Sequence, residues 1–133
     1  MFSPDTQILI VDDMPSIRDL IKKTLRALGY KKIEEAQDGD EGFRKLLQRK
    51  DTPEKIDLII SDWNMPKKNG LEFLREVRAH GQFKGIPFIL LTSESERDQV
   101  TEAILAGVSQ YIVKPFSPKV FIDKLKSTYA KHH

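Results

Sequence analysis

The chain has 133 residues, of which 39% are hydrophobic and 32% charged, and 22 Lys and Arg against 20 Asp and Glu give a formal net charge of +2. These values are typical of one globular domain, residues 1–133, and exclude a disordered or collagen-like chain. Because there is no cysteine, disulfides, thiolate zinc sites and cysteine nucleophiles are also excluded.

The distribution of apolar and charged residues predicts a cytoplasmic protein. No uninterrupted apolar run is longer than four residues, and the opening MFSPDTQ has no basic segment followed by an apolar one. We therefore expect neither a membrane span nor a signal peptide. Charges of both signs alternate along the chain, so nothing in the charge pattern indicates nucleic-acid binding.

Five short apolar segments recur along the chain at strand length. Most are apolar without a break, which is typical of strands that are buried on both faces of a parallel sheet. In chain order the predicted strands are 7–11, 32–36, 56–61, 86–91 and 109–113.

Amphipathic segments lie between and after these strands. In the first, Ile17, Ile21, Leu25 and their neighbours Leu20 and Leu28 recur every three or four residues and predict one apolar helix face, ending before Gly29. Four more helices are predicted from Phe43, Leu46 and Leu47; from Leu71, Leu74 and Val77; from Val100, Ile104 and Leu105; and from Phe121, Leu125 and Tyr129. Strands that alternate with helices predict an α/β protein of the doubly wound class, a five-stranded parallel sheet with helices on both faces.

Acidic, hydroxyl and ammonium side chains follow the predicted strands. Asp12 and Asp13 follow the first strand, Asp62 the third, Thr92 the fourth and Lys114 the fifth. Ligands of open parallel sheets bind at these carboxyl ends, so we expect the five side chains to lie together. Clustered carboxylates bind protons or a hard cation such as Mg²⁺, and lysine and threonine bind phosphate oxygens. The pattern therefore predicts phosphoryl transfer to an aspartate.

Each of these residues also has a simpler interpretation. Asp13 before Met14-Pro15 fits a helix N-cap, and Asp62 fits a turn. Thr92-Ser93-Glu94 fits a capping sequence that opens the fourth helix, and Lys114 fits a solvated charge. Cap and turn preferences do not explain why all of them stand at strand ends. Their coincidence favours a binding site.

Taken together, the motifs resemble the receiver domains of two-component response regulators, and among them the single-domain, CheY-type chemotaxis regulators. The resemblance covers Gln7 to about Tyr129, and it implies a flavodoxin-like strand order of 2-1-3-4-5. The motifs are Asp12-Asp13, Asp62-Trp63-Asn64-Met65-Pro66, Gly70-Leu71-Glu72, Thr92-Ser93-Glu94, Gly107, Tyr111 and Lys114-Pro115-Phe116.

The resemblance implies a role for each acidic residue. Asp62 corresponds to the phosphoacceptor, and Asp12 and Asp13 form the acidic pair that holds one Mg²⁺ together with Asp62 and the backbone carbonyl of Asn64. The side chains of Asn64 and Glu94 stand at positions that tune the lifetime of the phosphate.

The resemblance also implies a switch. Thr92 and Lys114 would contact the phosphoryl oxygens, the Lys114-Pro115 bond would be cis, and Tyr111 would move inward when Thr92 is drawn toward the phosphate. The partner surface would comprise the fourth helix, fifth strand and fifth helix. Its contact residues would be Ser95, Arg97, Val100, Tyr111, Val113 and Lys124.

The implied function is a signalling switch, not an enzyme, which catalyses only its own phosphorylation and dephosphorylation. Its partners would be a sensor histidine kinase, a phosphatase and a downstream target, most plainly the flagellar motor switch. We expect a monomer when it is unphosphorylated, with no direct contact to nucleic acid or membrane. The alternative within this family is a phosphorelay intermediate that passes its phosphate to a histidine phosphotransfer domain.

Two functions of other classes are alternatives, the first of them on the same fold. A flavodoxin-like cofactor carrier needs a glycine- or hydroxyl-rich phosphate loop, whereas Asp12-Asp13 would repel phosphate and no GxGxxG or GxxxxGK occurs. An aspartyl-phosphate hydrolase needs a second acid two residues after its nucleophile, and Asn64 and Met14 occupy those positions. Both patterns favour the switch.

Overall fold

The computed structural model describes residues 1–93 and 99–133. Within them the chain forms a five-stranded sheet in the order β2-β1-β3-β4-β5, with every neighbouring pair parallel. This confirms the predicted doubly wound class and strand order. The strands are β1 (Ile8–Val11), β2 (Ile33–Ala36), β3 (Leu58–Asp62), β4 (Phe88–Thr92) and β5 (Gln110–Val113). The helices are α1 (Pro15–Ala27), α2 (Gly39–Arg49), α3 (Gly70–Ala79), α4 (Val100–Leu105) and α5 (Pro118–His132).

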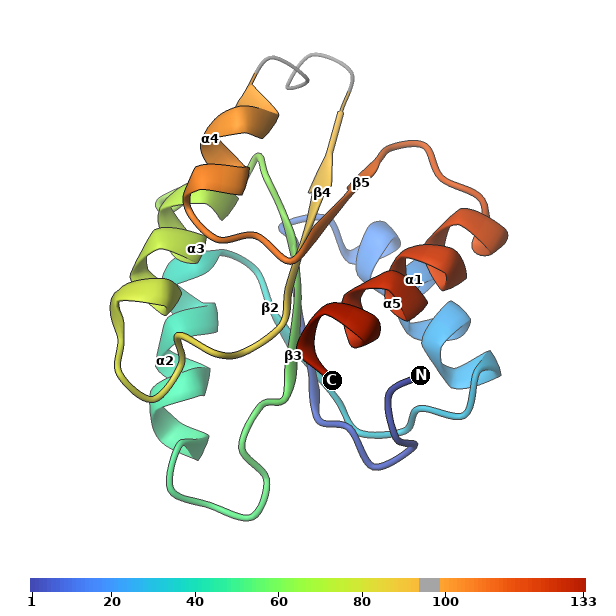
Figure 1. Cartoon of the computed structure of the whole chain (residues 1–133), viewed down its shortest axis with the longest axis horizontal. Helices are drawn as coiled ribbons and strands as arrows, with labels where there is room; N and C mark the ends of the chain where they lie inside the picture. The colour runs from blue at the N-terminus through green and yellow to red at the C-terminus, as the bar shows by residue number, and fades with distance from the viewer. Residues whose placement is uncertain (94–98) are drawn as a thin grey trace.

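The sheet lies between two layers of helices. Helices α1 and α5 cover one face, and α2, α3 and α4 cover the other (Figure 1). The carboxyl ends of the strands point toward the top of that view, and both termini lie near the opposite edge of the sheet. The loops at the top edge are therefore the ones that can meet in a single site.

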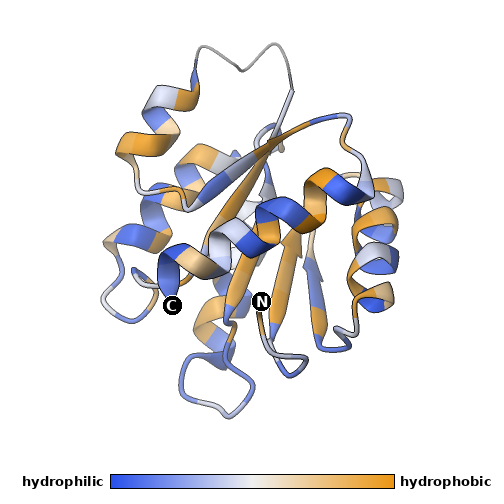
Figure 2. Cartoon of the chain, turned by 45° about the vertical axis from the view of Figure 1, so that its right-hand side comes forward, coloured by the Kyte–Doolittle hydropathy of each residue, from blue (hydrophilic) through white to orange (hydrophobic). Residues whose placement is uncertain are grey.

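Alternation along each strand divides the core between the two layers. On β1, Leu9 and Val11 pack with α2 and α3, while Ile8 and Ile10 pack with α1 and α5. Figure 2 shows the central strands as apolar along their length and the helices as two-sided. The uninterrupted apolar runs in the sequence thus reflect burial on both faces.

Two strands extend one residue further than the sequence indicated. Strand β3 ends at Asp62 and β4 ends at Thr92, so these residues are the last of their strands and not the first of the following loops. Their backbones are therefore held by the sheet: Asp62 is paired with Leu91, and Thr92 with Val113.

The predicted apolar faces of three helices are wider than the faces that the protein buries. The exposed members are Leu20 on α1, Leu47 on α2, and Ile104 and Leu105 on α4. On α4 the buried residue is Ala103, because this six-residue helix contacts the core over little more than one turn. A helical period gives the direction of the buried face, whereas its width depends on the neighbours.

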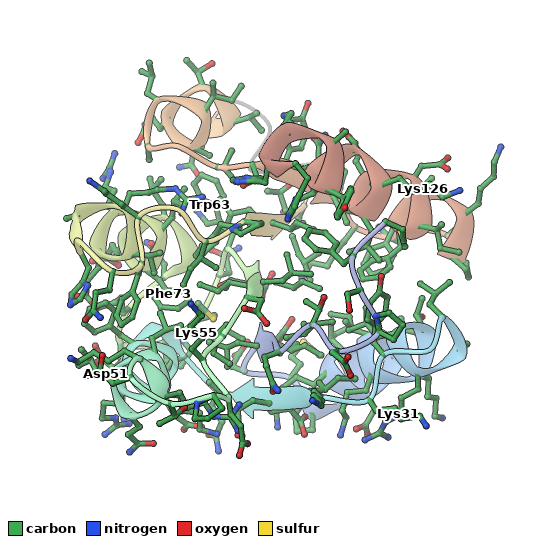
Figure 3. The ribbon with its side chains drawn as sticks, turned by 60° about the horizontal axis from the view of Figure 1, so that its bottom comes forward. Lys31, Asp51, Lys55, Trp63, Phe73 and Lys126 are labelled. Carbon is green, nitrogen blue, oxygen red and sulfur yellow. The ribbon has the colours of Figure 1, made fainter. Side chains whose placement is uncertain are left out.

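The side-chain view separates core from surface. Trp63 and Phe73 lie on the side of the sheet that α2 and α3 cover, and Lys31, Asp51 and Lys126 lie at the periphery (Figure 3). Among the helices of the described residues, none is long and apolar enough to cross a membrane.

Candidate metal centre

Three carboxylates meet at the carboxyl edge of the sheet. Each of Asp12, Asp13 and Asp62 offers one oxygen, and these oxygens all lie within 4.8 Å of one another. Asp12 directly follows β1 and is fully buried, Asp62 ends β3 and is 5% exposed, and Asp13 is exposed. The sheet therefore brings together the three carboxylates that the sequence predicted to converge.

The Asp12 carboxylate is only half satisfied. The backbone N–H of Met14 donates to Asp12 Oδ1 at 2.9 Å, while Oδ2 is buried and finds no hydrogen-bond partner among the described residues. Burial, followed by the negative charge of Asp62, raises the pKa of Asp12 from 3.8 to about 6, against the lowering effect of the Met14 hydrogen bond. A buried anion with one unused oxygen favours a proton or a cation at that oxygen.

The helix-cap interpretation of Asp13 is wrong. The N-cap of α1 is Met14, with no side-chain capping bond, although Pro15 does stand in the first turn. Asp13 is thus not explained by capping. The capping sequence predicted at Thr92-Ser93-Glu94 lies partly outside the described residues, although the Thr92 hydroxyl itself forms no capping bond to a described residue.

Lys114 supplies the positive charge of the site. Its Nζ lies 2.8 Å from Asp62 Oδ1, and its backbone N–H donates to the carbonyl of Thr92 at 2.6 Å. The bond between Lys114 and Pro115 is cis, as expected. The loop after β5 thus places an ammonium directly on the predicted phosphoacceptor, and the solvated-charge interpretation of Lys114 is wrong.

The Thr92 hydroxyl has no partner in the described part of the chain. Thr92 is 1% exposed, and its Oγ1 is buried without a hydrogen bond to any described residue. A buried hydroxyl without a partner costs on the order of 1–3 kcal/mol. It is the kind of group that a phosphoryl oxygen would satisfy.

Tight packing fixes the backbone behind Asp62. A Cβ on Gly70 would lie 2.3 Å from the carbonyl oxygen of Asp62 and 3.0 Å from Trp63 Cα, so only glycine fits. The Gly70 N–H donates to the Trp63 carbonyl at 2.8 Å, and Asn69 with Glu72 forms a capping box at the start of α3. The first turn of α3 therefore buttresses the end of β3.

The loop between β3 and α3 also contains the two lysines of Pro66-Lys67-Lys68-Asn69. Lys67 has a φ of 66°, in the left-handed region that non-glycine residues seldom adopt. The Lys68 ammonium pairs with Asp40 of α2 at 3.3 Å and with Glu76 of α3. The Lys68 charge is thus engaged by the helices rather than by the acidic cluster.

The remaining predicted residues are placed as follows. Asn64 is exposed and two residues beyond Asp62, and Tyr111 is half-buried against the core of the α2–α4 side, with Lys124 Nζ 5.1 Å from its ring centroid. Val100, Val113 and Lys124 are half-buried on α4, β5 and α5. Glu94, Ser95 and Arg97 lie outside the described residues.

Sequence reasoning missed one neighbour of the site. Arg18 lies outside the apolar positions of the first predicted helix, and its guanidinium Nη1 donates to the backbone carbonyl of Asp12 at 2.5 Å. Nothing in the local pattern distinguishes Arg18 from the other polar residues of this helix, such as Lys22 or Lys23. The contact depends on how α1 lies against the end of β1.

The donor set suits magnesium. Its side-chain donors are all carboxylate oxygens, and one of its members, Asp12, has a buried Oδ2 without a hydrogen-bond partner among the described residues. Magnesium prefers oxygen ligands and is usually held by one or two carboxylates with waters and phosphate. A divalent cation would also offset the mutual repulsion of the three aspartates.

Comparison with known proteins places these features in one family. The family model for the response regulator receiver domain matches residues 8–126. Chemotaxis protein CheY1 of Helicobacter pylori strain J99 is 45% identical over 120 residues, covering 90% of this chain and 94% of that protein.

Solved structures agree with the sequence comparisons. The chemotaxis response regulator CheY4 of Vibrio cholerae superposes with a TM-score of 0.82 at 35% identity, covering 93% of this chain and 98% of its own. The receiver domain of the sensor histidine kinase PA1611 from Pseudomonas aeruginosa PAO1, described with a magnesium ion coordinated in the active-site cleft, gives a TM-score of 0.80 at 27% identity, with 95% and 98% covered.

Proposed function

The chain belongs to the response regulator receiver family, in its CheY-type chemotaxis branch, and from this premise we propose that Asp62 accepts a phosphoryl group from a histidine kinase in the presence of Mg²⁺. Members of the family are phosphoacceptor signalling proteins that switch on phosphorylation, not classical enzymes. The observation that carries the proposal is the arrangement at Asp62: an ammonium 2.8 Å away and two further carboxylates within 4.8 Å.

One Mg²⁺ per chain would be held by Asp12, Asp13, Asp62 and the backbone carbonyl of Asn64. Receiver domains bind Mg²⁺ at an acidic cluster of this kind. The Oδ2 of Asp12 supports this assignment, because it is a buried oxygen of a cluster residue and has no hydrogen-bond partner among the described residues. The metal would supply charge neutralisation for the transferring oxygens.

Transfer to Asp62 is an in-line displacement at phosphorus. A carboxylate oxygen of Asp62 forms the new P–O bond while the P–N bond to the kinase histidine breaks, and the departing imidazole carries the electron pair of that bond. The Lys114 ammonium, already at Asp62 Oδ1, would stay on the phosphoryl oxygens and offset their charge. The product is an acyl phosphate on Asp62.

The switch would pass from Thr92 to Tyr111. Leu90 is paired with Tyr111, and both contribute to the core on the α2–α4 side. Because Thr92 is two residues after Leu90, alternation points Thr92 to the same face as Tyr111. A phosphoryl group adds about −1.5 to −2 charges and three acceptor oxygens, which would attract the Thr92 hydroxyl and change the space beside Tyr111.

The surface that responds would be α4, β5 and α5, and the target would be the flagellar motor switch. Val100, Tyr111, Val113 and Lys124 support this surface, since all four lie on those elements without being fully buried. The proposal places the protein in the cytoplasm as a single receiver unit, monomeric before phosphorylation. A phosphorelay role, with transfer to a histidine phosphotransfer domain, is the alternative that the partner experiment must separate.

Intact mass after incubation with acetyl phosphate tests the chemistry. We expect one phosphoryl adduct that requires Mg²⁺ in the wild type and in Asp123→Asn, whose substituted carboxylate is exposed on α5, and none in Asp62→Asn. An adduct on Asp62→Asn, or none on the wild type under conditions that label a control receiver, would refute the proposal. The same phosphorylated sample, mixed with a motor switch protein or with a histidine phosphotransfer domain, distinguishes the two partners.

A further inference from the structure

The polar atoms of Asp12 are used with one exception. Its backbone N–H donates to the Ala36 carbonyl at 3.1 Å, its carbonyl accepts from Arg18 Nη1 at 2.5 Å, and its Oδ1 accepts from the Met14 N–H at 2.9 Å. Only Oδ2 lacks a partner among the described residues, and it is buried. Three contacts from three segments thus fix the residue while leaving one oxygen for a ligand.

A second hydrogen bond, to Glu35, fixes the guanidinium of Arg18. Its Nε donates to Glu35 Oε1 on β2 at 3.0 Å, and the Arg18 side chain is only 13% exposed. The planar guanidinium therefore joins α1, the edge strand and the residue that follows β1. A guanidinium can direct two donors in fixed directions, which a flexible ammonium cannot do.

We propose that Arg18 is a positioning residue for the metal centre, holding the Asp12 peptide so that the Asp12 carboxylate keeps its place in the acidic cluster before any cation binds. The inference rests on the proposed function, since it takes Asp12 as a magnesium ligand. Fixing a ligand in advance lowers the entropy lost on binding, and partners that orient metal ligands typically change affinity by roughly 10- to 100-fold.

Electrostatics alone predicts the opposite effect of removing Arg18. A positive charge one contact away from Asp12 repels Mg²⁺, so its loss without any change in geometry would tighten binding. Positioning requires that its loss weaken binding. The direction of the change therefore separates the two roles.

Lys22 provides a matched control. Its Nζ also binds Glu35, at 3.0 Å, and among the described residues it otherwise contacts Asp19 and not Asp12. Arg18→Met and Lys22→Met remove the same unit of charge from the same helix and the same glutamate. Only the first removes the hydrogen bond to Asp12.

Magnesium titration of the two variants tests the proposal. The readout is the fluorescence of Trp63, the only tryptophan, which follows Asp62 in the chain. We expect Arg18→Met to bind Mg²⁺ about 10-fold more weakly than the wild type, and Lys22→Met to bind within about twofold. In the metal-free proteins, the Met14 amide resonance should shift in Arg18→Met and stay in place in Lys22→Met, which a general loss of stability would not produce.

Glu35→Gln keeps the proposal testable if Arg18→Met fails to fold. This substitution keeps Arg18 and its hydrogen bond to Asp12, but it weakens the hydrogen bond between Arg18 and residue 35. The affinity for Mg²⁺ should therefore fall by less than in Arg18→Met. Unchanged or tighter Mg²⁺ binding in Arg18→Met overturns the inference. If Arg18→Met does not fold, the same result in Glu35→Gln overturns it. A wild type that binds no Mg²⁺ would instead refute the proposed function itself.

Discussion

Two groups of carboxylates flank strand β1, and only one of them is fully paired. Glu34 and Glu35 on the edge strand β2 are half-buried, and each forms ion pairs with two cations on the adjoining helices. The pairs are Glu34 with Lys45 and Arg49, and Glu35 with Lys22 and Arg18. At the carboxyl end of β1, Asp12 is more deeply buried and yet retains an oxygen without a partner among the described residues.

The pKa values move in opposite directions as a result. Burial would raise the pKa of Glu34 and of Glu35, but hydrogen bonds from Lys45 to Glu34, and from Lys22 and Arg18 to Glu35, lower both below 4.5. At Asp12 burial prevails and raises the pKa to about 6. The comparison shows that burial alone does not set the direction of the pKa shift, which depends on whether cations pair with the buried carboxylate.

The largest expected effect is the pH dependence that Asp12 imposes on the metal-free protein. Because the pKa of Asp12 is about 6 in the folded protein against an ordinary value of 3.8, Asp12 stabilises the fold below pH about 4, and this contribution is lost as pH rises through 6. In EDTA, the unfolding free energy of Asp12→Asn relative to that of the wild type should therefore rise by on the order of 3 kcal/mol between pH 4 and pH 7. Urea unfolding at several pH values measures the difference.

Magnesium supplies the control for that experiment. Saturating Mg²⁺ should stabilise the wild type at pH 7 and leave Asp12→Asn nearly unchanged, because ligand binding stabilises only the state that binds it. A pH-independent difference between the two proteins in EDTA would contradict the account of Asp12.

A smaller effect is expected at two buried threonines, of which one has a hydrogen-bond partner for its hydroxyl and the other has none among the described residues. Thr92 Oγ1 has no partner among the described residues, whereas Thr128 Oγ1 donates to the Lys124 carbonyl at 2.7 Å, and each residue is at most 1% exposed. Thr92→Val should raise the unfolding free energy of the metal-free protein by about 1 kcal/mol, and Thr128→Val should lower it by about 1 kcal/mol. Equal losses in both variants, measured by urea unfolding, would show that the Thr92 hydroxyl is satisfied.

The paired and unpaired groups also differ in how well sequence predicts them. Asp12, Asp62, Thr92 and Lys114 were predictable because a parallel sheet brings all strand carboxyl ends to one edge, so a position in the chain is enough to place them. The strand pattern needs only local periodicity, and it predicted the class of fold.

Contacts of long side chains were not predictable in the same way. Arg18 reaches the Asp12 carbonyl, and Lys68 pairs with Asp40 and Glu76, only because of how particular helices lie against one another. The exposure of Leu105, at 83%, has the same origin: the apolar pattern continues past the part of α4 that the core covers. Periodicity gives faces, and tertiary packing decides which residues on them are in contact.

The smallest expected effect tests the paired side of the comparison. Glu34→Gln leaves Lys45 and Arg49 without their carboxylate, and we expect a loss of about 0.5–1 kcal/mol of unfolding free energy at low salt, because half-exposed ion pairs are weak and screened. Asp5→Asn removes a more exposed and longer pair, 3.8 Å to Lys32, and should change almost nothing. Unlike Asp12→Asn, Glu34→Gln should destabilise the protein whether or not Mg²⁺ is present. If Glu34→Gln instead stabilises the protein in urea unfolding, Lys45 and Arg49 do not offset the cost of burying the Glu34 carboxylate. Ion pairing would then no longer explain why the pKa values of Glu34 and Asp12 shift in opposite directions.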